Sequence, residues 1–279
     1  ISFSEALKRQ AEEDIQKILT TIHRKKYQIY SENMEFYAMS NLLREEVNSK
    51  GRFPTNSEVG FGKFKTWYQS KRARDHHART IPAERAWHAI RLLKGRIEAP
   101  KKFLGGKQGK TDLIQQMQDI TDLRKWDGKD QEYLANTVID YQSELLNSGW
   151  DALDLAKQAL QDLQGKKDPV IFHEIFCDEA QDFTEIELAY LREKCSKNPL
   201  WPTKLGYCLN LAGDDMQTIN PTGFNWEQYR DAWFGESEEM PEMWVLSQNE
   251  RSDKKIVNLA NRFLEVQKNY FERHVDTQE

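Results

Sequence analysis

The chain has 279 residues, of which 30% are charged and 38% hydrophobic, and its mean hydropathy is -0.82. A chain of this length can form about two domains, each with a core of its own. No apolar stretch approaches the roughly 20 residues that cross a bilayer, so the composition argues against a membrane-spanning protein and predicts no membrane partner.

The cysteines are few and widely spaced. Cys177, Cys195 and Cys208 are odd in number and form no C-x-x-C pair, which argues against a disulfide framework. We therefore expect a reducing compartment, the cytoplasm or, in a eukaryote, the nucleus. Cys177 is expected to pack as a small hydrophobic side chain. Because the chain starts with Ile1 and shows no signal-peptide pattern, we interpret it as a segment of a longer chain.

The net charge of -5 is distributed unevenly. Residues 61–110 carry 14 Lys or Arg against three acidic residues, which is +11, so the rest of the chain sums to -16. A basic segment with interleaved aromatic residues favours a polyanionic partner, and the alternative is a solvated helical face. The predicted nucleic-acid contacts in this segment are Trp67, Lys71, Arg72, Arg74, Arg79 and Arg85.

The first predicted elements alternate between strand and helix. Residues 1–3 indicate the end of a strand, and Ser4 is a suitable N-cap for a helix over residues 5–22, whose apolar residues recur at helical spacing. Residues 35–40 predict a short strand that leads into a helix over residues 41–48. A strand followed by a helix, repeated, is typical of an α/β domain.

The pattern changes from about residue 51. Gly and Pro interrupt a basic stretch, and mainly helical segments follow to about residue 165. The clearest helix covers residues 150–164, with one apolar stripe and with Asp151 placed to cap it. Residues 51–165 therefore predict a basic, helical insertion subdomain.

Three short apolar runs follow Pro169, and each leads directly into polar residues. The runs are 173–179 (HEIFCDE), 207–215 (YCLNLAGDD) and 243–252 (MWVLSQNERS). Ligands of parallel sheets bind at the carboxyl ends of the strands, so these polar ends are expected to converge on one crevice. A final helix behind the N-cap candidate Ser252 is expected to cover the sheet. The predicted fold is thus an α/β domain formed by residues 1–50 and 166–279.

The polar ends of these runs together resemble three motifs of superfamily 1 helicases of the UvrD/Rep type, namely Walker B and the third and fourth motifs. The matching residues are Asp178–Asp182 (DEAQD), Gly213–Ile219 (GDDMQTI) and Gln248–Ser252 (QNERS). The resemblance implies a RecA-like P-loop NTPase domain with an incomplete parallel sheet, ATP and Mg²⁺ as cofactors, and single-stranded nucleic acid, first of all DNA, as partner. Residues 86–96 (AWHAIRLLKGR) look closest to the branch of large helicase-like proteins with TPR and ankyrin repeats.

The resemblance also implies a role for individual residues. Asp178 matches the carboxylate that holds Mg²⁺, and Glu179 would polarise the attacking water. Gln217 matches the γ-phosphate sensor, and Arg251 the arginine that neutralises the transferring phosphoryl group. The implied cofactor-binding set is Asp178, Gln181, Asp214, Gln217 and Arg251. The alternatives are helix capping for the two acidic residues, and a surface turn and a solvated ion pair for the other two.

Two aromatic positions complete the comparison with the family. Phe224 and Trp226 follow the third motif, where the family carries an aromatic residue that stacks on a base, and the alternative is core packing. Glu250 stands where the family usually has an aromatic residue that stacks on adenine. The sequence therefore leaves adenine recognition at that position open.

A phosphate-binding loop is the motif that the chain lacks. It needs G-x-x-x-x-G-K-[ST] between a strand and a helix, and residues 104–113 (LGGKQGKTDL) fail because Leu104 stands where the first glycine belongs. The family order places the loop before residue 1 and the second RecA-like domain after residue 279. The 279-residue chain alone is therefore expected not to hydrolyse ATP.

Two classes of function remain open from the sequence. The first is a fragment of an ATP-dependent helicase or translocase. The second is a catalytically inactive helicase-like module that binds nucleic acid or a protein. A nuclease is disfavoured, because no further set of acidic residues and lysine accompanies the carboxylates.

Overall fold

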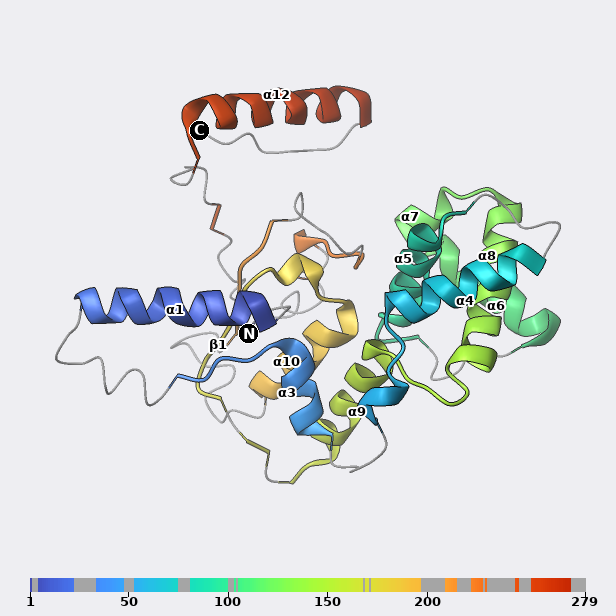
Figure 1. Cartoon of the computed structure of the whole chain (residues 1–279), viewed down its shortest axis with the longest axis horizontal. Helices are drawn as coiled ribbons and strands as arrows, with labels where there is room; N and C mark the ends of the chain where they lie inside the picture. The colour runs from blue at the N-terminus through green and yellow to red at the C-terminus, as the bar shows by residue number, and fades with distance from the viewer. Residues whose placement is uncertain are drawn as a thin grey trace. The chain divides into compact units, whose positions relative to one another are not determined.

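The computed structural model is mainly helical, with a small parallel sheet (Figure 1). It describes residues 1, 5–22, 34–47, 53–74, 81–99, 103, 105–167, 169–170, 172–196, 209–214, 222–227, 229, 244–245 and 252–271. The chain forms two compact units, Ile1–Tyr229 and Arg230–Glu279. This architecture agrees with the predicted α/β class.

The described part of the first unit contains mainly helices, with two short strands. They are α1 (Glu5–Ile22), α3 (Met39–Glu46), η1 (Thr55–Ser57), α4 (Phe61–Arg74), α5 (Ala83–Lys94), α6 (Gly106–Gln118), α7 (Thr121–Arg124), α8 (Gly128–Asp140), the π-helical turn η2 (Tyr141–Leu145), α9 (Ala152–Gly165), β1 (Ile175–Cys177), η3 (Ala180–Asp182), α10 (Glu185–Ser196) and β2 (Leu209–Leu211). None of the described helices is long and apolar enough to cross a membrane.

The sheet is parallel, and β1 has a neighbour on each side. Cys177 of β1 lies opposite Leu211 of β2. On the other side, the Ile1 ammonium donates to Phe176 O at 2.5 Å and Asp178 N donates to Ile1 O at 3.0 Å, which is the bonding pattern of a parallel strand. The N-terminal residue therefore pairs with the sheet as a strand end would, in line with the prediction for residues 1–3.

Helix α9 forms a layer with α3 and α10. Its apolar stripe, from Leu155 to Leu163, is buried, and α10 and α3 are its main neighbours. Asp151 caps the helix: its Oδ1 accepts from Leu153 N and Asp154 N, and Asp154 Oδ2 accepts in return from Asp151 N. The predicted cap is confirmed, and it is a reciprocal capping box.

Helices α4 to α8 build a core of their own. In Figure 1 they gather to one side of α3, α9 and α10. Phe64 is fully buried at the centre of this core, with ring centroids 5.0 Å from Trp87 and 5.6 Å from Tyr141. The chain enters and leaves this region at one point, since Glu58 and Trp150 form a parallel β-bridge. The described residues between the two bridge positions therefore form one compact region that starts and ends at the same place.

Two predicted details are wrong. Residues 35–40 do not form a strand, because α3 already begins at Met39 and only Ala38 takes part in a β-bridge. In the second unit, helix α12 (Lys254–Phe271) is capped by Asp253, whose Oδ1 accepts from Lys255 N at 2.8 Å, and not by Ser252. Both residues are good N-caps, so the sequence alone does not decide between neighbours.

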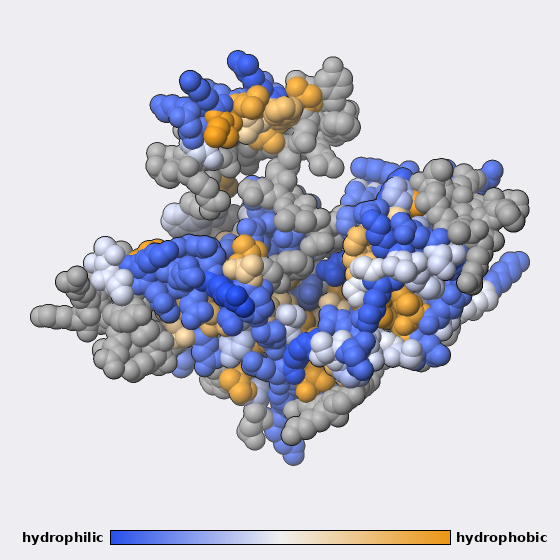
Figure 2. Space-filling view, in the orientation of Figure 1, coloured by the Kyte–Doolittle hydropathy of each residue, from blue (hydrophilic) through white to orange (hydrophobic). Residues whose placement is uncertain are grey.

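Helix α12 carries an exposed apolar stripe. Ile256, Leu259, Phe263 and Val266 are 51–64% exposed, and Figure 2 shows apolar side chains along this helix. The stripe repeats at helical spacing, as expected for a helix with one packing face.

A buried carboxylate joins three helices. Glu46, at the end of α3, is 2% exposed and forms ion pairs with Lys166, just after α9, and with Lys194 of α10 at 2.6 Å. The hydroxyl of Tyr190 also donates to it. Burial raises the pKa of Glu46, but hydrogen bonds from the two lysines lower it more, so its net pKa lies below the ordinary value.

Replacing Glu46 with alanine is expected to lower the free energy of unfolding by about 3–5 kcal/mol, because it leaves the buried Lys194 ammonium without a carboxylate. Chemical denaturation at pH 7 measures the change. The difference from wild type should persist at neutral pH and shrink as the pH falls below about 4.5, where glutamate in the unfolded chain binds a proton.

The matched control is Glu45→Ala, at the exposed neighbouring position. It should change the free energy of unfolding by no more than about 0.5 kcal/mol. Equal losses for the two variants would contradict a special role for Glu46.

Candidate functional site

Strand β1 ends in two acidic residues. Burial raises the pKa of Cys177, the last residue of the strand, to about 12, so the thiol remains protonated and packs as a small hydrophobic side chain, as predicted. Asp178 follows and is exposed, with its Oδ1 accepting from Glu179 N at 3.0 Å. The chain therefore leaves the sheet with one carboxylate facing solvent directly after the strand.

Glu179 has an unusual backbone conformation. Its φ of 54° and ψ of 44° are left-handed, and among the described residues it is the only non-glycine with positive φ. This conformation costs a residue with a side chain about 1–2 kcal/mol. Such strain persists where surrounding contacts fix it, and it is concentrated at functional sites.

The buried amide of Gln181 connects the ends of β1 and β2. Its Nε2 donates to Glu179 Oε2 at 2.6 Å, and its Oε1 accepts from Asp214 N at 3.1 Å, just after β2. Its own backbone oxygen accepts from Thr222 Oγ1 at 2.6 Å. Backbone bonds reinforce the junction, since Ala180 N donates to Ala212 O at 2.8 Å. The first two motifs therefore do meet at the carboxyl edge of the sheet, as expected.

Gly213 leaves the space that this amide needs. A Cβ atom at Gly213 would lie 2.3 Å from Gln181 Oε1 and 3.1 Å from Ala180 N. Because Gln181 is fully buried and bonded at both ends of its amide, it has little room to move aside. Glycine at this position follows from the close approach of the two strand ends.

The donor set at this edge suits a hard cation. Mg²⁺ in nucleotide sites takes one or two carboxylates and completes its shell with water and phosphate oxygens. Asp178 is an exposed carboxylate of that kind, and Glu179 lies beside it. No group of three or more His, Cys, Asp and Glu side chains that would hold a metal without a nucleotide occurs in the described part of the chain.

Other predicted site residues are not part of the described junction of β1 and β2. Gln217 and Arg251, with Glu250, lie outside the described residues. Phe224 and Trp226 are described and half-buried, with their rings edge to face at 4.6 Å, and Phe224 also stacks on Tyr229 at 5.1 Å. These contacts are those of a small aromatic cluster, and base stacking by either ring stays a prediction.

Two of the predicted nucleic-acid contacts are bound within the insertion. Lys71 forms ion pairs with Asp140 at 2.7 Å and Glu144 at 2.6 Å, and the Trp67 indole nitrogen donates to the same Glu144 at 3.0 Å. Partial burial lowers the pKa of Lys71, but these two carboxylates raise it more, so the lysine is charged. Its charge is therefore already balanced by protein.

Arg85 is more accessible. It is exposed on α5, with its guanidinium 4.2 Å from the centre of the Trp126 ring. Arg72 and Arg74 belong to α4, but their side chains lie outside the description, as does all of Arg79. Nucleic-acid binding by these residues stays a prediction.

From Gly106 onward, the glycine-rich stretch at 104–113 is helical. Gly109, Lys110 and Thr111 lie within α6, where Thr111 Oγ1 donates to Lys107 O at 3.0 Å. Lys110 pairs with Glu132 at 3.7 Å. A helix interior cannot wrap its backbone around a phosphate, which agrees with the rejection of this segment as a phosphate loop.

Sequence reasoning missed one unusual residue, Arg91 on α5. It is buried among apolar neighbours of the same helix, between two small cavities. In the sequence it resembles every other arginine of the basic segment, and only the packing distinguishes it.

Comparison with protein-family models gives no match, and comparison with curated proteins gives none either.

Replacing Gly213 with alanine is expected to lower the free energy of unfolding by about 1–3 kcal/mol, because the new methyl group displaces the Gln181 amide. Urea denaturation measures the loss. Gly128→Ala is the control, since a Cβ there meets nothing within 4 Å. It should be neutral or stabilise by up to about 1 kcal/mol. Similar behaviour of the two variants would contradict the proposed close approach.

Proposed function

We propose that this chain is part of an ATP-dependent helicase or translocase of superfamily 1, and that its sheet belongs to a RecA-like domain. The observation that carries the proposal is the junction of Asp178, Glu179 and Gln181 with Gly213 and Asp214. These residues come from two motifs that the sequence separates, and they meet at the carboxyl edge of a parallel sheet, where ligands of such sheets bind.

The chemistry of the proposed site divides between the two carboxylates. Asp178 would hold Mg²⁺, and a bound Mg²⁺ neutralises charge on the phosphate oxygens of ATP. Glu179 would accept a proton from, and orient, the attacking water. Gln181 fixes the Glu179 carboxylate through the 2.6 Å hydrogen bond and is therefore a positioning residue.

The proposed nucleotide site needs further groups besides the junction of β1 and β2. Gln217 would sense the γ-phosphate and Arg251 would neutralise the transferred group. We propose that a phosphate loop in a preceding segment and a second RecA-like domain in a following segment complete the nucleotide site. The proposed partner is single-stranded nucleic acid, DNA in the first instance.

A second candidate is a helicase-like binding module without catalysis. The specific observation in its favour is that Gly109, Lys110 and Thr111, which form the Gly-Lys-Thr sequence of the chain, lie inside helix α6. The two candidates differ in a single measurable property, namely turnover of ATP that depends on Glu179.

In a protein that extends this chain at both ends, Glu179→Gln is expected to lower DNA-stimulated ATP turnover by roughly 10²–10⁴-fold, because it removes the general base. Binding of Mg²⁺-ATP should remain, since the amide keeps the shape of the side chain. Phosphate release and nucleotide binding are measured on the same preparation.

The matched control is Glu174→Gln, an identical change before the start of β1, at an exposed residue that accepts from Asn210 Nδ2. It should leave turnover unchanged. Absence of turnover in the wild-type extended protein, with DNA and with RNA, would favour the binding module.

Single-stranded DNA is expected to bind the insertion through its backbone, so log affinity should fall with log salt by roughly 0.7 for each phosphate contacted. Arg85→Glu should weaken binding and reduce this slope, because Arg85 is exposed. Fluorescence anisotropy at several salt concentrations measures both.

Lys129→Glu supplies the control, since Lys129 is exposed in the same subdomain but outside the basic segment. If it weakens binding as much as Arg85→Glu does, net charge alone explains the effect and a contact at Arg85 is refuted.

A further inference from the structure

Arg91 is a buried cation with unused donors. Its residue is 9% exposed, and its Nε and Nη2 atoms are buried without a hydrogen-bond partner among the described residues. A guanidinium is always charged and presents its donors in a planar fork. Burial of such a group is unfavourable unless an anion or polar acceptor meets it.

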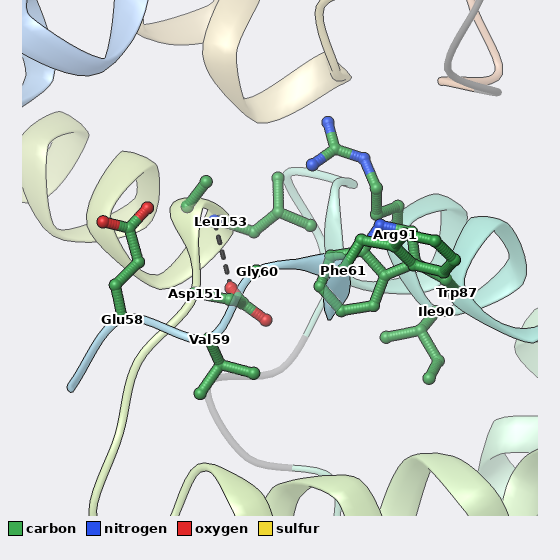
Figure 3. Close-up of a pocket in the computed structure, with 10 residues that line it drawn as sticks. Glu58, Val59, Gly60, Phe61, Trp87, Ile90, Arg91, Asp151 and Leu153 are labelled. Carbon is green, nitrogen blue, oxygen red and sulfur yellow. Dashed lines mark hydrogen bonds between the residues drawn. The ribbon is translucent and has the colours of Figure 1, made fainter. Parts of the chain in front are cut away.

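The carboxylates nearby are already bonded to other groups. Asp151 accepts from Lys94 Nζ at 2.6 Å and from the Tyr141 hydroxyl at 2.8 Å, in addition to capping α9. In Figure 3 the Arg91 side chain extends away from the Asp151 carboxylate. No ion pair joins the two within the described part of the chain.

Two further carboxylates at the same place are also bonded elsewhere. Glu58 pairs with Arg44 at 2.8 Å. Glu187 accepts from both the backbone nitrogen and the hydroxyl of Thr184, at 2.8 and 2.6 Å. Arg91 thus lies among carboxylates without forming an ion pair with them.

Two cavities meet at Arg91. One has a volume of about 200 Å³ and the other of about 120 Å³, and Glu58, Arg91 and Ala152 line both. The larger one has the rings of Phe61 and Trp87 in its wall (Figure 3). Ala152 is the first residue of helix α9, whose N-terminal end is already capped by the Asp151 carboxylate, so the cation of this space is Arg91. The Glu58 side chain is 40% exposed, so the space reaches the surface at this residue.

We infer that this space binds a small organic anion: a carboxylate or phosphate group on a flat, apolar body. The planar fork of Arg91 suits the oxyanion, because it carries a positive charge and matches the geometry of a carboxylate or phosphate. Phe61 and Trp87 suit an aromatic or similarly flat body. Glu58 limits the negative charge that the site tolerates, which favours a carboxylate over a doubly charged phosphate. The inference does not depend on the proposed helicase function.

Benzoate and phenyl phosphate are the probes, and benzamide is the neutral analogue of benzoate. Calorimetric titration of the whole chain should show binding of benzoate, weaker binding of phenyl phosphate and no binding of benzamide. Arg91→Met should weaken benzoate binding by roughly tenfold to a hundredfold, since it removes charge-assisted hydrogen bonds. In the absence of any anion the same variant should melt at a higher temperature than wild type, because it removes a buried unpaired charge.

Arg85→Met is the matched control, since it makes the same change at an exposed position of the same helix. It should leave benzoate binding unchanged. If Arg91→Met does not fold, Arg91→Lys takes its place and should also lose at least about tenfold, because lysine keeps the charge but not the planar fork. Equal binding of benzoate and benzamide, no binding of any probe, or unchanged benzoate binding in the Arg91 variant would each overturn the inference.

Discussion

Buried ion pairs fix helix α9 at both ends, one with residues of the core of helices α4 to α8 and the other with residues of α3 and α10. At the N-terminal end Asp151, which is 4% exposed, bonds to Lys94 and Tyr141 of the insertion. Burial raises the pKa of Asp151, but Lys94 lowers it more, so the aspartate remains charged. At the other end Lys166 joins the pair of Glu46 and Lys194. Removal of one partner from such a group costs about 3–5 kcal/mol, so α9 is fixed at both ends.

The parts of the fold that the sequence predicts are those set by local rules. The reciprocal cap of α9 needs only residues three apart, and β1 and β2 each show an apolar run that ends in polar residues. The predicted strand at 35–40 is wrong because α3 already begins at Met39; the aromatic residues that favour a strand precede this helix, and the ring of Tyr37 lies edge to face with that of Phe172, with centroids 6.0 Å apart. Tertiary contacts of this kind override local preference.

The sequence predicts that the polar ends of β1 and β2 meet, but it does not predict the hydrogen bonds that join them. The motifs identify Glu179, Gln181 and Asp214. They do not reveal that Glu179 adopts a left-handed conformation or that one buried amide binds both strand ends. Hydrogen bonds on both sides of Glu179 fix this conformation. A helix cap, the alternative interpretation of these acidic residues, does not require a strained glutamate. Strain at the end of a strand therefore supports a chemical role independently of the resemblance.

The charge of the insertion shows why composition overstates a binding surface. Residues 61–110 sum to +11, but residues 51–165 contain 19 basic and 15 acidic residues and sum to only +4. The acidic partners come from later in the chain: Glu144, which binds Lys71, is 73 residues away. Charges farther apart than the screening length of about 10 Å barely interact in ordinary salt, so local pairing matters more than the sum. Attraction of a polyanion to this subdomain therefore depends on which cations remain exposed, as Arg85 does, and not on the total charge of the segment.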